Sequence, residues 1–123
     1  MVGGAAPVTS QLSTALDSVT RLHGVRGALV VSGDDGMVVA GSLMEGVRGN
    51  AIAALAASLT LRLGQAAKKS GVGTPHFLEL QASDGTLVVV PGPTGVLVVV
   101  IGDKELNVGL ARLEMLRVAE VVW

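Results

Sequence analysis

The stretch 86-TLVVVPGPTGVLVVVIGD-103 contains two almost entirely apolar runs separated by turn-forming residues, Pro91 to Gly95. In an antiparallel hairpin with one solvated face, apolar and polar residues alternate, because successive side chains point to opposite faces. Here the residues of both faces are apolar. The stretch therefore predicts two strands, 87–90 and 96–101, in the middle of a sheet that is covered by helices on both sides.

The composition limits what the core and the chemistry can be. Half of the 123 residues are hydrophobic, cysteine is absent, and the large aromatic side chains are Phe77 and Trp123. The core must therefore consist of Val, Leu, Ile and Ala, and disulfides, thiolate zinc sites and a thiol nucleophile are excluded. A net charge of −1, with Lys and Arg scattered along the chain, gives no support to binding of nucleic acid or to a polybasic membrane anchor.

The mean hydropathy of +0.62 is high for a soluble chain. A membrane-spanning helix needs about 20 continuous apolar residues, and the run 87–101 is shorter and is interrupted by Pro and Gly. The N-terminal MVGGAAPV lacks the basic and apolar regions of a signal peptide. We therefore expect a cytoplasmic protein without direct membrane insertion, with residues 1–8 as a flexible arm and residues 9–123 as a single domain.

Three helices and three more strands are predicted from the remaining patterns. Apolar residues at helical spacing predict a helix over 9–23, strong helix formers fill 47–70, and Asp103 is expected to cap a helix that runs to the end of the chain. Strands are expected at 28–31, 37–40 and 74–82.

The predicted fold class follows from this order, α-β-β-α-β-β-β-α. Hairpin connections make the five-stranded sheet mostly antiparallel. The long helix covers one face and the two terminal helices cover the other, which gives a three-layer α-β-α sandwich of the α+β type. Pro75 at the start of the 74–82 strand cannot donate a hydrogen bond to a neighbouring strand, so we expect this strand at an edge of the sheet.

The long helix carries apolar residues on two sides. The stripe expected to cover the sheet comprises Ile52, Leu55, Leu59, Leu63 and Ala66. The roughly opposite stripe comprises Ala53, Ala54, Ala57, Leu61 and Gly64, and a polar strip of Ser58, Arg62, Gln65 and Lys69 lies between the two. The small-residue stripe favours close approach of a partner, because the whole chain has an apolar surplus. The alternative is an ordinary alanine-rich helix without a partner.

Motifs for catalysis are missing from the sequence. His23 and His76 have no metal-pair spacing, no serine lies in a G-x-S-x-G elbow, and the carboxylates are dispersed. Asp34 and Asp35 lie in GDDG, which indicates a turn rather than a metal site. GVGTPH and PGPTG do not have the spacing of phosphate-binding loops. We therefore expect a protein that is not an enzyme, with no catalytic residues, cofactor or metal.

Three stretches of the sequence lie on either side of a long Ala/Leu helix: 24-GVRGALVVSGDDGMVVAGS-42, 84-DGTLVVVPGPTGVLVVVIGD-103 and 107-NVGLARLEMLRVAE-120. In this order they resemble the roadblock/dynein light-chain superfamily, and within it the bacterial MglB-like members. The resemblance covers residues 10–122 and rests on the order of elements together with the closing helix. It implies a homodimer that pairs the third strand across a two-fold axis, with the long helices side by side. It also implies a role as a non-catalytic regulator of a Ras-like small GTPase, either as a GTPase-activating protein or as a co-GTPase adaptor.

The residues that would take these roles can be read from the matched positions. The dimer interface would be formed by His76, Phe77, Leu78, Glu79 and Leu80. The GTPase would bind Ala54, Ala57, Ser58, Leu61, Arg62, Gln65 and Lys69. Regulation would be conformational, and an arginine finger from Arg62 or Arg48 is a further possibility. The MglB-like proteins often carry a C-terminal extension, whereas this sequence ends at Trp123 directly after an apolar helix, as expected either of a compact member or of a truncated domain.

Two other functions stay open at this stage. The same dimer could be a scaffold subunit of a larger complex without effect on GTP hydrolysis. A sheet flanked by helices also describes profilin-like and sensory domains, which bind small molecules in a cavity with several converging polar groups. The close-packed Val and Leu predicted for this core offer few such groups, so the scaffold is the stronger alternative.

Overall fold

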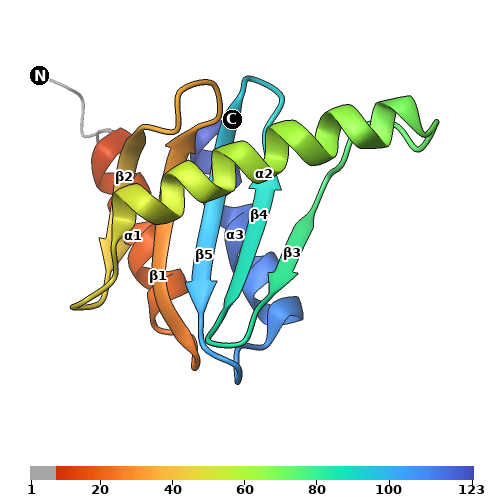
Figure 1. Cartoon of the computed structure of the whole chain (residues 1–123). Helices are drawn as coiled ribbons and strands as arrows, with labels where there is room; N and C mark the ends of the chain where they lie inside the picture. The colour runs from red at the N-terminus through yellow and green to blue at the C-terminus, as the bar shows by residue number, and fades with distance from the viewer. Residues whose placement is uncertain (1–7) are drawn as a thin grey trace, which may run out of the picture.

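In the computed structural model, which describes residues 8–123, one sheet is covered by helices on both faces (Figure 1). The elements are α1 (Val8–Thr20), β1 (Val25–Ser32), β2 (Val38–Leu43), α2 (Gly49–Lys69), β3 (Leu78–Gln81), β4 (Thr86–Pro91), β5 (Val96–Gly102) and α3 (Val108–Val122). The strand order is β2-β1-β5-β4-β3, and every neighbouring pair is antiparallel. The predicted fold class is confirmed, with a sheet that is antiparallel throughout.

The two apolar strands lie inside the sheet, as their composition predicts. β5 is the central strand, β4 lies beside it, and nearly every residue of both is buried. Val88 and Val98 point to the face covered by α1 and α3, whereas Val89 and Val99 point to the face covered by α2. Because full burial of such a side chain contributes about 1.5–3 kcal/mol, the two layers of contacts explain why both faces of these strands are apolar.

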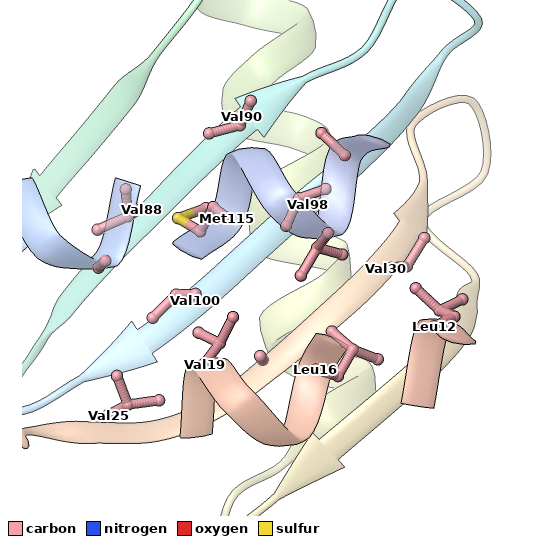
Figure 2. Packing of buried hydrophobic residues seen from close by; sticks show 14 of the residues in the cluster. Leu12, Leu16, Val19, Val25, Val30, Val88, Val90, Val98, Val100 and Met115 are labelled. Carbon is pink, nitrogen blue, oxygen red and sulfur yellow. The ribbon is translucent and has the colours of Figure 1, made fainter. Parts of the chain in front are cut away.

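The larger core lies between the sheet and helices α1 and α3 (Figure 2). Leu16 and Val19 of α1 and Met115 of α3 are at most 1% exposed. They belong to one cluster with Val30 of β1 and the inward-facing valines of β4 and β5. The aliphatic core expected from the near absence of aromatic residues is therefore present, and Met115 of α3 is the one methionine of this cluster.

Two predicted boundaries need correction. Val8 is the first residue of α1, and residues 1–7 of the predicted arm lie outside the described part of the chain. Helix α3 is capped by Asn107, whose side-chain oxygen accepts a hydrogen bond from the Leu110 backbone N–H at 3.1 Å, and not by Asp103. The Asp103 carboxylate accepts instead from the Glu105 backbone N–H at 2.8 Å, and so it stabilises the turn before the helix.

None of the helices within residues 8–123 has the length and apolar character needed to cross a membrane.

Candidate functional site: the exposed sides of helix α2 and the edge strand β3

Strand β3 lies at one end of the sheet, as Pro75 predicts. Leu78 pairs with Val89 of β4 and Gln81 pairs with Thr86, while the outer edge of β3 pairs with no strand among residues 8–123. The strand is shorter than the predicted 74–82. Continuing the register would place His76 opposite Pro91, which has no backbone N–H to donate, so the ladder with β4 ends before that point. An open edge of this kind is a template for a further strand.

The five residues predicted for the dimer interface lie on or directly before this strand. Leu78 is buried in the core under α2, and Leu80 is half-buried on the same face of the sheet. Phe77 points to the opposite face and packs against the α1–α3 core, and His76 and Glu79 are exposed. Backbone pairing along the outer edge would therefore leave the side chains of both faces in their present layers.

Helix α2 covers the sheet with its first half only. Its buried residues are Ala53, Ala56 and Ala57. Alanine permits close approach between the helix and the strands, because the side chain ends at Cβ. The second half of the helix extends beyond β3, so that it projects over the open edge of the sheet (Figure 1).

The predicted assignment of the helix faces was correct only in part. Ile52 and Leu59 of the predicted sheet-facing stripe pack against the core under α2, but so do Ala53 and Ala57 of the small-residue stripe. Leu55 and Leu63 of the predicted sheet-facing stripe are 45% and 42% exposed. We call Leu55, Leu59 and Leu63 the leucine flank. Leu55 forms an apolar groove with Leu80, Leu87 and Ile101, so the leucine flank lies on the side of α2 that faces β3. Sequence analysis missed this flank as a contact surface, because a helical wheel does not show which apolar stripe the sheet will cover.

The predicted partner-binding residues form an outward surface of α2, with one correction. Ala54, Ser58, Leu61, Arg62, Gln65 and Lys69 are all exposed, and we call them the docking face. Ala57 is only 8% exposed because its side chain packs in the core between α2 and the sheet, so it contributes little to this surface. Leu61 is 60% exposed and is the large apolar side chain of the docking face.

The turn between β1 and β2 borders the docking face, which the sequence did not indicate. The Asp35 carboxylate accepts a hydrogen bond from the Met37 backbone N–H at 3.0 Å, so the predicted turn role is confirmed for this residue. Gly36 has a φ of +71°, and a Cβ at this position would lie 3.4 Å from the Cα of Ala54. The turn thus packs against α2, and Asp34 and Asp35 line a shallow groove together with Leu61 and Arg62.

The arrangement is suited to contacts with another protein. Within residues 8–123 no three His, Asp or Glu side chains are grouped so that they could hold a metal ion. The exposed groups around α2 are instead leucines on both sides of a projecting helix, a few dispersed charges and an unpaired strand edge. These are features that protein interfaces use.

The fold and this surface define a three-layer α-β-α domain with a free edge strand. Comparison with known proteins gives the family: the model of the Roadblock/LC7 domain matches residues 12–101. The chain belongs to the Roadblock/LC7 family. It is also 30% identical over 111 residues to the uncharacterized protein MJ1340 of Methanocaldococcus jannaschii, covering 90% of this chain and 96% of that protein.

Solved structures with the same fold include bacterial proteins. MglB of Myxococcus xanthus has a TM-score of 0.79 at 18% identity, covering 92% of each chain. The gliding protein MglB of Thermus thermophilus has a TM-score of 0.80 at 20% identity, covering 96% of this chain and 90% of that one. A further structure, described as MglB with a tetrameric arrangement, has a TM-score of 0.81 at 22% identity, covering 96% and 89%. The predicted membership of the roadblock superfamily, with similarity to MglB, is confirmed.

Proposed function

We propose that this protein is a homodimeric, non-catalytic regulator of a Ras-like small GTPase, which binds through the docking face of α2. The structural similarity to MglB supports this role, and so does the surface that the fold leaves uncovered. The second half of α2 projects beyond the sheet with exposed leucines on two sides, next to an unpaired strand edge. This observation carries the proposal, because in an isolated subunit both the exposed leucines and the strand edge would face solvent without a partner.

Dimerisation across the outer edge of β3 would cover the leucine flank, which is the apolar surface of α2 that faces β3. A two-fold axis beside β3 makes the sheet continuous through both subunits and brings the same residues of each copy together. The projecting half of α2 then lies over the sheet of the partner subunit. In this arrangement the leucine flank faces its own copy, and the groove formed by Leu55, Leu80 and Leu87 lies under the partner's helix.

The docking face would remain free on the outside of such a dimer. Leu61 supplies an apolar contact, Arg62 and Lys69 supply positive charge, and the neighbouring turn supplies Asp34 and Asp35. With no acid–base pair to contribute, the protein would act by favouring the GTPase conformation in which the GTPase aligns its own catalytic residues. An arginine finger from Arg62 is the second mechanism, since this side chain is exposed at the centre of the face.

The test is the rate of GTP hydrolysis by the Ras-like GTPase encoded nearest to this gene, with and without the protein. We expect acceleration by the wild-type protein and its loss in Leu61→Asp, because a charge in an apolar contact weakens binding. Leu113→Asp, which alters an exposed leucine on the far side of the sheet, is the matched control.

Three results would speak against parts of the proposal. Tight binding of the GTPase with an unchanged rate of GTP hydrolysis would contradict the regulatory role and favour the scaffold function. If Arg62→Ala lowers the stimulated rate of GTP hydrolysis a thousandfold or more, Arg62 acts as an arginine finger, because such a residue typically contributes about 10³–10⁵ in rate. Absence of binding would remove the GTPase as a partner.

A further inference from the structure

The groove between helix α2 and the turn of β1 and β2 carries opposite charges on its two walls, and we call it the turn groove. Asp34 and Asp35 line it from the turn, whereas Leu61 and Arg62 line it from α2. The other lining residues are small: Gly33, Gly36, Ala54, Ala57 and Ser58. The groove has a volume of about 290 Å³. Because the small residues leave this space open, a long side chain of another protein can enter it.

Backbone hydrogen bonds hold the turn in place beside α2 (Figure 1). The Gly33 N–H donates to the Gly95 carbonyl oxygen at 2.7 Å, which joins this turn to the turn between β4 and β5. The Gly36 N–H donates to the Ser32 carbonyl oxygen at 2.9 Å. The backbone that carries the two aspartates is therefore fixed before a partner binds, and binding costs less conformational entropy than ordering a mobile loop would.

The charged groups of the turn groove are available to a partner. The Asp35 carboxylate already accepts a hydrogen bond from the Met37 N–H, whereas the Asp34 carboxylate accepts none from a residue in the range 8–123. The ion pairs in that range are His23–Glu105 and Glu114–Arg117. Asp34 and Arg62 thus line one groove without pairing with each other, and each keeps its hydrogen-bonding capacity for a partner.

The charge pattern along α2 shows which end of the docking face suits which charge. The helix contains no acidic residue, and its positive charges all lie in its second half, at Arg62, Lys68 and Lys69. Glu45 and Arg48, shortly before the helix, cancel in charge. The surface is therefore negative at the turn and positive toward the end of α2. A partner binds best when its own charges have the opposite order.

We infer that the turn groove binds a lysine or arginine side chain of the GTPase, with the alkyl stem along Leu61 and the positive head group at the Asp34 carboxylate. Long basic side chains pack their methylene groups on apolar surface while the charged end stays near solvent. An acidic side chain would instead meet two carboxylates and be repelled. The inference rests on the proposed function, because it states how the same GTPase is recognised and oriented on the docking face.

The charge is tested by the kinetics of binding to the immobilised GTPase, loaded with a non-hydrolysable GTP analogue. At about 50 mM NaCl we expect Asp34→Asn to lower the association rate constant about tenfold, and Asp34→Lys to lower it further. At about 500 mM NaCl the difference between Asp34→Asn and wild type should shrink, because salt screens exposed charges. Glu120→Gln is the matched control, since it removes the same charge from the exposed side of α3.

The groove itself is tested by Ser58→Met, which fills it without changing its charge. Ser58 is exposed, so the longer side chain does not disturb the core. We expect the affinity to fall by about tenfold or more at both salt concentrations, because a steric block is not screened by salt. Ser13→Met, at an exposed position of α1 on the other face of the sheet, is the matched control.

The two variants separate a side chain bound in the groove from general attraction. Slower association of Asp34→Asn with unchanged affinity of Ser58→Met would overturn the inference, because the turn would then only steer the GTPase. Wild-type binding by Asp34→Asn, Asp34→Lys and Ser58→Met would also overturn it and would leave the proposed function intact. Absence of binding by the wild-type protein would remove the proposed function, and the inference with it.

Discussion

The guanidinium carbon of Arg112 lies 4.7 Å from the centre of the Phe77 ring. This cation–π contact joins helix α3 to the residue immediately before the edge strand β3. Phe77 is also packed against the α1–α3 core, so Arg112 covers its outer side. The contact holds the segment that enters β3 and therefore helps to set the position of the strand edge.

Arg112→Ala should lower the free energy of unfolding by about 0.5–1 kcal/mol, the usual contribution of an exposed cation–π pair. Arg112→Lys should have a smaller effect, because lysine retains the charge but cannot stack its head group flat on the ring. Urea unfolding at one fixed protein concentration measures both. Equal stability of wild type and Arg112→Ala would show that the contact contributes nothing.

Leu63→Asp and Leu61→Asp should separate dimerisation from docking. Both leucines are exposed on the projecting half of α2, so neither substitution disturbs the core. Leu63 belongs to the leucine flank, and its replacement should convert the dimer into a folded monomer. Leu61 belongs to the docking face, and its replacement should leave the dimer intact and weaken GTPase binding at least tenfold.

Light scattering after gel filtration gives the mass of each variant, and circular dichroism shows that it is folded. The reverse assignment, with Leu61→Asp monomeric and Leu63→Asp dimeric, would contradict the orientation of α2 in the dimer. Leu78→Asp is unsuitable for this purpose. Leu78 is only 8% exposed within the core, so a carboxylate there should unfold the domain.

Gly92→Ala should displace the indole of Trp123. A side chain at position 92 would overlap the indole nitrogen, which lies against this glycine in the turn between β4 and β5. Because Trp123 is 42% exposed, its ring can move into solvent without unfolding the domain. Trp123 is the single tryptophan of the chain, so a red shift of the intrinsic fluorescence reports the movement. An unchanged emission spectrum would show that the indole does not occupy this position.

Asn107→Ala should destabilise the protein by about 1 kcal/mol, because the first turn of α3 loses the side-chain acceptor for its backbone N–H. Asn107→Asp is the control, since aspartate keeps the acceptor and places a negative charge at the positive end of the helix dipole. Thermal unfolding at neutral pH measures both variants. A loss of stability in Asn107→Asp as large as that in Asn107→Ala would mean that the amide group has another function.

The fold could be predicted from the sequence because its strongest signals are local. The two valine-rich strands have apolar residues on both faces, a pattern that only a doubly covered sheet satisfies, and the helices have the 3.6-residue period. The ends of the helices could be predicted less precisely, because capping depends on which side chain lies within hydrogen-bond distance of a free backbone N–H. Asp103 and Asn107 are both suitable caps by residue type, and only the geometry shows that Asn107 takes this role.

The candidate site could be predicted in part. Pro75 indicated the edge strand, and six of the seven residues predicted to bind a partner are exposed, with Ala57 as the exception. Their role in binding stays a prediction. The orientation of α2 could not be predicted, because two apolar stripes compete for one sheet. Ala53, Ala56 and Ala57 lie against the sheet since alanine permits closer packing, and this leaves Leu55 and Leu63 free for another contact.

The central claim is that a second copy covers β3 and the leucine flank. Sedimentation equilibrium of the wild-type protein at a few micromolar tests it most directly. We predict a mass twice the 12.4 kDa of one chain, and the mass of a single chain for Leu63→Asp. A wild-type protein with the mass of one chain under these conditions would contradict it.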